Sequence, residues 1–174
     1  MRFKITNIAA IALITFAALA LGAVSTASAA SVESSAGITV LESLQVSETS
    51  SVDFGYVHRP SEGQNTLTLH HADDSVTTDG DGDAQYVAGS SSSGLYLIEG
   101  APERGIQMSV DIQDFDDPGL TLEEAHIDGP TDEASGYLDT FGQHSAGVGG
   151  VLTIDADAEV TTHTTDVEVT VDYE

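Results

Sequence analysis

Aspartate alternates with glycine from Asp79 to Asp83, and this pattern comes nearest to a metal site in the chain. Hard cations such as Ca2+ prefer several carboxylate oxygens on a flexible backbone, and Asp79, Asp81 and Asp83 would supply three carboxylates. An EF-hand loop would also need glycine at its sixth position and a bidentate glutamate at its twelfth, where this chain has Ala84 and Ser90. The segment is therefore expected to be an Asp-Gly turn, with a Ca2+ site as the alternative.

Other residues that could carry catalysis lack the partners they would need. A nucleophilic serine in a G-x-S-x-G turn beginning at Gly89 would require glycine where Ser93 stands. The chain has no Cys, which excludes thiol catalysis and Cys-ligated metal centres. No two histidines have the chelating spacing of two or four residues; they are His58, His70, His71, His126, His144 and His163. The sequence therefore predicts no catalytic residues, no enzyme activity and no cofactor besides the Ca2+ considered above.

Two stretches of small residues are predicted to be loops. The four serines between Gly89 and Gly94 predict a flexible loop. The glycines at 147, 149 and 150 lack the Lys-Ser/Thr pair of a phosphate-binding loop. They predict a tight turn that leads into Val151.

Residues 1–29 have the pattern of a secretory signal peptide. The basic residues Arg2 and Lys4 precede a mostly apolar run from residue 5 to 24, and small residues then end in Ala27-Ser28-Ala29. Cleavage is expected after Ala29, leaving residues 30–174 as one domain. An uncleaved anchor is the alternative, because about 20 apolar residues can span a bilayer. The protein is expected to be extracytoplasmic, either periplasmic, on the outer surface or secreted, and free of the membrane after cleavage.

The chain is strongly acidic, with 29 Asp and Glu against four Lys and Arg. After removal of residues 1–29 only Arg59 and Arg104 stay basic, so the expected net charge is −27. A nucleic-acid-binding surface needs clustered Lys and Arg, which excludes nucleic acid as a partner. Anionic membrane surfaces are disfavoured for the same reason. The acidity indicates a solvated surface that repels other copies of itself.

Apolar residues recur with a period of two, which is typical of strands with one face in a core. The clearest cases are Ile106–Ile112 and Val167–Tyr173, with shorter ones at 52–56, 67–69 and 152–156. These strands and the turn-rich stretches between them predict an all-β fold, a single antiparallel β-sandwich. Its inward-facing residues are expected to include Phe54, Leu97, Ile106, Met108, Val110, Leu152, Ile154, Val169 and Val171.

Three segments give less regular patterns. Residues 95–98 are apolar on both faces and predict a central strand. Residues 38–46 predict a strand with a bulge around Leu41–Ser43, because the apolar parity shifts there. Residues 120–125 are the one candidate for a helical turn.

An ordered set of motifs resembles the secreted bacterial domain-of-unknown-function family 4402. The motifs are Val52-Asp53-Phe54-Gly55, the strand Gly94–Gly100, Gly149–Ile154 and the terminal Val167–Tyr173. The resemblance implies an Ig-like β-sandwich and export, and it implies no catalytic residues. Pilin subunits of chaperone–usher systems are a looser likeness, since they also end in an alternating strand with a penultimate Tyr. This chain departs from them in having no Cys and in having Thr161-Thr162 near a position where they carry Gly.

We therefore expect an exported, non-catalytic protein of the cell surface or periplasm with a structural or adhesive role. Self-assembly would make it a pilin-like subunit, whose partner is another copy or another surface protein joined by strand addition. The alternative is a secreted module that binds Ca2+ or a glycan. The chain has no Trp to form an aromatic platform for a sugar, which weighs against the glycan.

Overall fold

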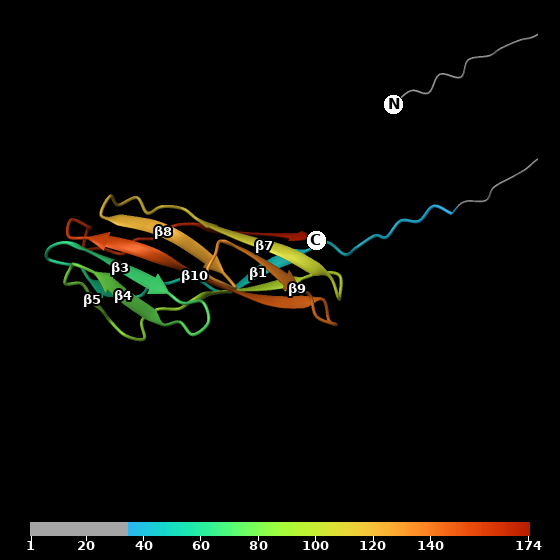
Figure 1. The fold of residues 1–174 in the computed structure, drawn as a ribbon, viewed down its shortest axis with the longest axis horizontal. Helices are drawn as coiled ribbons and strands as arrows, with labels where there is room; N and C mark the ends of the chain where they lie inside the picture. The colour runs from blue at the N-terminus through green and yellow to red at the C-terminus, as the bar shows by residue number, and fades with distance from the viewer. Residues whose placement is uncertain (1–34) are drawn as a thin grey trace, which may run out of the picture. The chain divides into compact units, whose positions relative to one another are not determined.

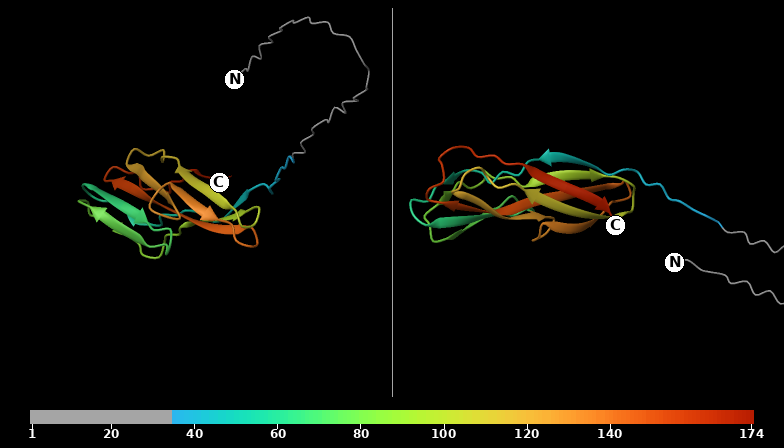
Figure 2. Two further views of the ribbon diagram at one scale, coloured as in Figure 1. Left: turned by 45° about the vertical axis from the view of Figure 1, so that its right-hand side comes forward. Right: turned by 90° about the horizontal axis from the view of Figure 1, so that it is seen from above.

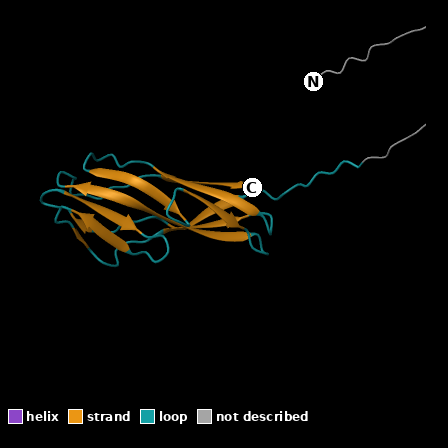
Figure 3. Cartoon of the chain, in the orientation of Figure 1, coloured by secondary structure: helices purple, strands orange, loops and turns teal. Residues whose placement is uncertain are grey.

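The structure is a computed structural model that describes residues 35–174, so the expected signal peptide lies outside the described residues. The described part consists of strands and connecting loops, without a helix, and so without one that could cross a membrane (Figure 3). The all-β prediction is confirmed. The strands are β1 (Gln45–Ser50), β2 (Val57–His58), β3 (Gln64–Leu69), β4 (Val76–Gly80), β5 (Gln85–Tyr86), β6 (Gly94–Glu99), β7 (Gly105–Ile112), β8 (Leu120–Ile127), β9 (Glu133–Tyr137), β10 (Gln143–Asp155) and β11 (Val167–Tyr173).

The strands form two main antiparallel sheets that pack against each other. The larger sheet has the order β1-β6-β10-β3-β4, and β8 also pairs with β10. The smaller sheet has the order β11-β7-β9, while β2 and β5 form a separate short pair. Figure 2 shows the two layers from above. This arrangement confirms the predicted antiparallel sandwich.

Strand β10 is the centre of the larger sheet (Figure 1). Its residues 143–148 pair with β6, residues 150–155 with β3, and residues 148–154 with β8. Because residues 150–154 have partners in both β3 and β8, these two strands lie on opposite edges of β10. The tight turn predicted at the glycines before Val151 is therefore wrong, since Gly147, Gly149 and Gly150 lie in the middle of this strand.

The main core lies between the two sheets. Strand β7 contributes Ile106, Met108, Val110 and Ile112, which alternate with exposed or half-buried polar residues as the period of two predicts. A fully buried aliphatic side chain contributes about 1.5–3 kcal/mol, so these four are a large part of the fold's stability. The residues that pack with them are Tyr96, Ile98, Ile127, Leu138, Ala146 and Val148. A second cluster holds Leu67, Leu120, Leu152, Ile154 and Ala158.

Some of the predicted inward residues are not fully buried. Leu97 is half-buried, and its neighbours Tyr96 and Ile98 face the core instead, so the predicted parity of β6 is wrong by one residue. Phe54, Val169 and Val171 are half-buried at the margins of the two clusters.

Two segments differ from their predicted secondary structure. Residues 120–125 belong to β8 and pair with β10, so the predicted helical turn is wrong. The predicted strand at 38–46 begins only at Gln45, and Ile38 and Val40 are exposed. A bulge does occur in β1, but at Thr49, where the register with β6 shifts.

We expect Val110→Asp to lower the free energy of unfolding by about 3 kcal/mol or more, because it buries an unpaired charge in the main core. Glu168→Gln, on the exposed face of β11, should change it by less than about 0.5 kcal/mol. Urea unfolding of both variants measures the difference. Equal losses would contradict the assigned strand parity.

Candidate functional site

The predicted Ca2+ ligands lie at the end of β4 and in the bend that follows it, and all three are exposed. Asp79 Oδ1 accepts a hydrogen bond from the Gly80 N–H at 2.8 Å, and Asp81 Oδ1 accepts one from the Gln64 N–H at 3.2 Å. The carboxylate of Asp83 accepts hydrogen bonds from the N–H (2.5 Å) and the hydroxyl (2.7 Å) of Ser61. The bend is thereby fastened to the segment that leads into β3.

These hydrogen bonds also stabilise the charged form of the carboxylate. The Ser61 hydroxyl, followed by the Ser61 N–H, lowers the pKa of Asp83 below its ordinary value. Among residues 35–174, no group of three His, Asp or Glu side chains is arranged so that it could hold a metal ion. Asp79, Asp81 and Asp83 are each hydrogen-bonded to a different residue, and a Ca2+ site at them stays a prediction.

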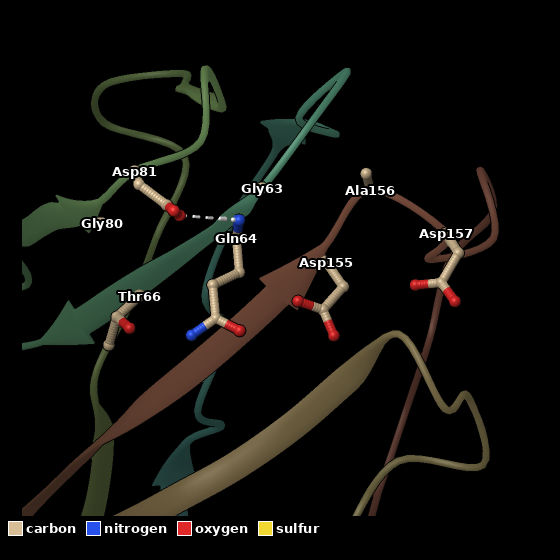
Figure 4. Close-up of a pocket in the computed structure, with 8 residues that line it drawn as sticks. All are labelled: Gly63, Gln64, Thr66, Gly80, Asp81, Asp155, Ala156 and Asp157. Carbon is tan, nitrogen blue, oxygen red and sulfur yellow. Dashed lines mark hydrogen bonds between the residues drawn. The ribbon is translucent and has the colours of Figure 1, made fainter.

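An open hollow of about 770 Å3 lies between the β3–β4 hairpin and the end of β10. Asp81, Asp155 and Asp157 contribute carboxylates to its lining. Figure 4 shows Asp81 on one side of Gln64, and Asp155 and Asp157 on the other. The hollow is therefore acidic, but its three carboxylates do not converge on one point.

The serine-rich loop between Gly89 and Gly94 is held by hydrogen bonds rather than left flexible. Asp74, whose φ is 58°, accepts hydrogen bonds from the N–H (2.7 Å) and the hydroxyl (2.6 Å) of Ser93. The hydroxyl of Ser93, and then its N–H, lowers the pKa of Asp74. The other hydroxyls of the loop donate to backbone carbonyls: Ser90 to Val87, Ser91 to Asp74, and Ser92 to Ser51.

Asp117, in the turn sequence Asp116-Asp117-Pro118-Gly119, is a buried carboxylate. It accepts hydrogen bonds from the N–H groups of Gly119 and Glu159, both at 2.8 Å. These two bonds, the one from Glu159 first, lower the pKa of Asp117, and His163 lies 3.4 Å from its Oδ2. Asp117 thereby fastens the long loop before β11 to the start of β8. The Asp-Pro-Gly sequence predicts the local turn, with its hydrogen bond from Gly119, but not the hydrogen bond from Glu159.

Three of the six histidines each contact a single carboxylate. His126 lies 3.1 Å from Glu124, at an acidic groove of about 590 Å3 between β7 and β8. His144 lies 2.9 Å from Asp128, and the third is His163 beside Asp117. The three contacts are separate from one another, and the one between His126 and Glu124 lies within β8, so they do not form a common centre.

Strands β1 and β11 are outermost strands of the two sheets, and a hydrogen bond from the Tyr173 hydroxyl to the Glu42 carbonyl joins the end of β11 to the residues before β1. Within residues 35–174, strand β1 pairs only with β6, and β11 pairs only with β7. The core-facing residues Val167, Val169 and Val171 of β11 are half-buried, whereas their counterparts on β7 are buried. The smaller sheet is therefore incompletely covered on this side.

Strand β1 shows the same incomplete cover from the larger sheet. Val46 lies directly opposite Ile98, so the two side chains share a face, yet Ile98 is 0% exposed and Val46 is 40% exposed. Glu48 lies opposite Tyr96 on that face, and after burial its charge further raises the pKa of Tyr96. We call the strip formed by Val46, Glu48 and the three valines of β11 the β1–β11 seam. It combines core-facing apolar side chains with solvent access.

Tyr173 closes one end of the seam. Its hydroxyl donates to the carbonyl of Glu42 and accepts from the N–H of Ala101, both at 2.7 Å. The residues before β1 are thereby attached to the end of β11. The alternation in the sequence predicts only an apolar strand position at Tyr173, because the polar partners of its hydroxyl are far away in the chain.

Comparison with known proteins gives one family. The family model described as Domain of unknown function (DUF4402) matches residues 44–173, which include all eleven strands. No curated protein matches the chain. No solved structure matches it either.

Asp117→Asn should lower the melting temperature at pH 7 more than Asp116→Asn does, because Asp116 is exposed. The folded-state pKa of Asp117 lies below its ordinary value of 3.8, so its ionised form stabilises the fold. That contribution is complete above about pH 4 and is lost as the pH falls through the folded-state pKa. In melts between pH 7 and pH 3, the gap between the wild-type chain and Asp117→Asn should narrow below about pH 4. A constant gap would contradict this role.

Tyr173→Phe should lower the free energy of unfolding by about 1–2 kcal/mol, because the N–H of Ala101 and the carbonyl of Glu42 lose their partner. Tyr137→Phe is the control, since Tyr137 is 60% exposed on the smaller sheet, and it should cost less than about 0.5 kcal/mol. Urea unfolding compares the two. An equal effect would show that the Tyr173 hydroxyl does not hold the end of the seam.

Proposed function

The chain belongs to the DUF4402 family of unknown function, and from this premise we propose an exported, non-catalytic protein with a structural or adhesive role. It acts at the cell surface or in the periplasm as a subunit that associates through a sheet edge. The observation that carries this proposal is the β1–β11 seam.

The seam has the two properties that strand addition needs. A free strand edge offers unpaired N–H and C=O groups to another chain, and that pairing supplies affinity. The half-buried valines of β11 and the 40% exposed Val46 offer apolar positions that an added strand would cover. Covering them gains free energy, because each square ångström of apolar surface removed from water contributes about 25 cal/mol.

The edge strand β8 carries features that oppose such pairing. In β8, Glu123 is an extra residue that forms a bulge opposite β10, and Glu124 beside it is also exposed. Bulges and charges are common protections of sheet edges against association. Strand β11 has no bulge, since all seven of its residues pair with β7 in one continuous register. This difference supports association through β11.

The placement of the polar side chains supports a structural rather than a catalytic role. The serines of the Gly89–Gly94 loop donate to backbone carbonyls or to Asp74, and Asp79, Asp81 and Asp83 accept from backbone N–H groups. These groups hold loops in place. Their hydrogen bonds therefore stabilise the fold.

Association should depend strongly on salt. Copies with an expected net charge of −27 repel one another, and the Debye length falls from about 10 Å at 0.1 M to about 3 Å at 1 M salt. We expect the purified, exported chain to be monomeric at 0.1 M NaCl and to form dimers or larger species at 2 M NaCl. Sedimentation velocity across a range of protein concentrations measures this. A folded chain that stays monomeric at every salt and protein concentration would contradict the proposal.

A Ca2+-binding module is the second candidate, and the acidic hollow with Asp81, Asp155 and Asp157 favours it. Because these carboxylates do not converge, we expect NaCl and CaCl2 at matched ionic strength to raise the melting temperature equally. A bound ion would add stability by mass action on the folded state. A rise of several degrees that is specific to Ca2+ and disappears in Asp81→Asn would favour this candidate over a purely structural role.

A further inference from the structure

The segment that precedes β1 has the composition of a strand but pairs with no strand in the described part of the chain. Residues 35–44 form neither helix nor strand. Ala36, Ile38 and Val40 alternate with Gly37 and Thr39, and this period of two is typical of a strand with one apolar face. Ile38 is 89% exposed and Val40 is 83% exposed. The apolar face of this segment is therefore left in water.

The β1–β11 seam offers what this segment lacks. As far as the structure describes the chain, strand β11 has an unpaired edge along seven residues, and its inner valines are half-buried. A strand laid along that edge would make backbone hydrogen bonds with β11 and would turn alternate side chains toward the core. Ile38 and Val40 have the required spacing of two residues.

We propose that residues 36–41 of one copy add as a strand along β11 of a second copy and place Ile38 and Val40 in its β1–β11 seam. This inference rests on the proposed function, because it names the segment and the edge through which the subunits associate.

Charge favours this segment as the occupant. The exposed side chains of the seam and of β11 include Glu48, Glu168 and Asp172, so an acidic strand would be repelled there. Residues 35–41 carry no charged side chain. A second copy can therefore supply an uncharged strand to an acidic edge, although the two domains as wholes repel each other.

The segment's own domain is a less suitable acceptor. The Tyr173 hydroxyl holds the carbonyl of Glu42 at the end of β11, and β1 then runs in the direction opposite to β11 (Figure 2). To lie along β11 of the same chain, the segment would have to reverse sharply into β1. Residues 41–44 contain no Gly, Pro, Asn or Asp, and Ser43 alone is of a type that favours such reversals.

The test uses the purified, exported chain at 2 M NaCl, with sedimentation velocity as the readout. In the donor variant, Ile38→Asp with Val40→Asp, we expect the dissociation constant to rise by about tenfold or more, since two charges would enter an apolar strip. Thr39→Asn, an uncharged change on the opposite face of the same segment, is the control and should keep its association within about twofold. An Asp at this position would itself be repelled by Glu168 and Asp172 on the outer face of β11. Both positions 38 and 40 are exposed in the single chain, so the donor variant should keep the wild-type melting temperature.

A second pair of variants tests the acceptor. Val46→Asp should weaken association, whereas Ser47→Asp on the other face of β1 should not. The donor variant keeps an intact seam, and Val46→Asp keeps an intact segment. When the two variants are mixed, the intact segment of Val46→Asp can enter the intact seam of the donor variant, so heterodimers should form and association should be restored. If both mutations damaged one shared patch, mixing would not restore association.

Each outcome decides between the two proposals. Association that persists in the donor variant, or that mixing does not restore, overturns the assignment of residues 36–41 and leaves subunit association standing. A wild-type chain that is always monomeric overturns both. A monomer whose melting temperature falls in the donor variant shows that the segment occupies its own seam, which also overturns the proposal of a second copy.

Discussion

The close passage of β10 between β3 and β8 is the constraint on which the rest of the sandwich depends. A Cβ atom at Gly149 would overlap the carbonyl oxygen of Leu69 in β3, and one at Gly150 would lie 2.8 Å from the carbonyl oxygen of Glu124 in β8. Glycine at these two positions lets the backbones of β3 and β8 come this close to β10, whereas residues 151–154 pair with both strands and carry side chains. Because the first half of β10 also pairs with β6, this one strand connects the two hydrophobic clusters.

Without a disulfide, the loops of this domain are held by carboxylates that accept backbone hydrogen bonds. Asp117 does this for the loop before β11, and Asp74 for the serine-rich loop. Asp128 accepts from the Gly147 N–H at 2.6 Å and also contacts His144. A part of the high acidity is therefore structural, while the exposed remainder supplies the repulsion between copies.

The sequence predicts those strands in which apolar and polar residues alternate regularly. It does not predict features that depend on contacts with residues far away in the chain. The bounds of β11 follow from its four alternating residues, whereas β6 is apolar on both faces, so its parity could not be predicted and Leu97 was misplaced. In β8 the bulge at Glu123 breaks the alternation and imitates a helical turn. In the candidate site, the regular spacing of Asp79, Asp81 and Asp83 is visible in the sequence. The role of Asp117 is not, because it depends on Glu159, 42 residues away.

The edge strands of this sandwich differ in their bulges and in their exposed charges, and this difference connects the fold to the proposed association. Bulges interrupt β8 and β1, and β8 also exposes Glu123 and Glu124, so pairing along β8 is opposed both by geometry and by charge. The seam keeps its apolar strip in spite of these protections, next to a continuous edge of β11. An uncharged alternating segment in the same chain meets both conditions for entering it. In the proposed assembly, this acidic, cysteine-free domain therefore associates through the seam and the residues that precede β1.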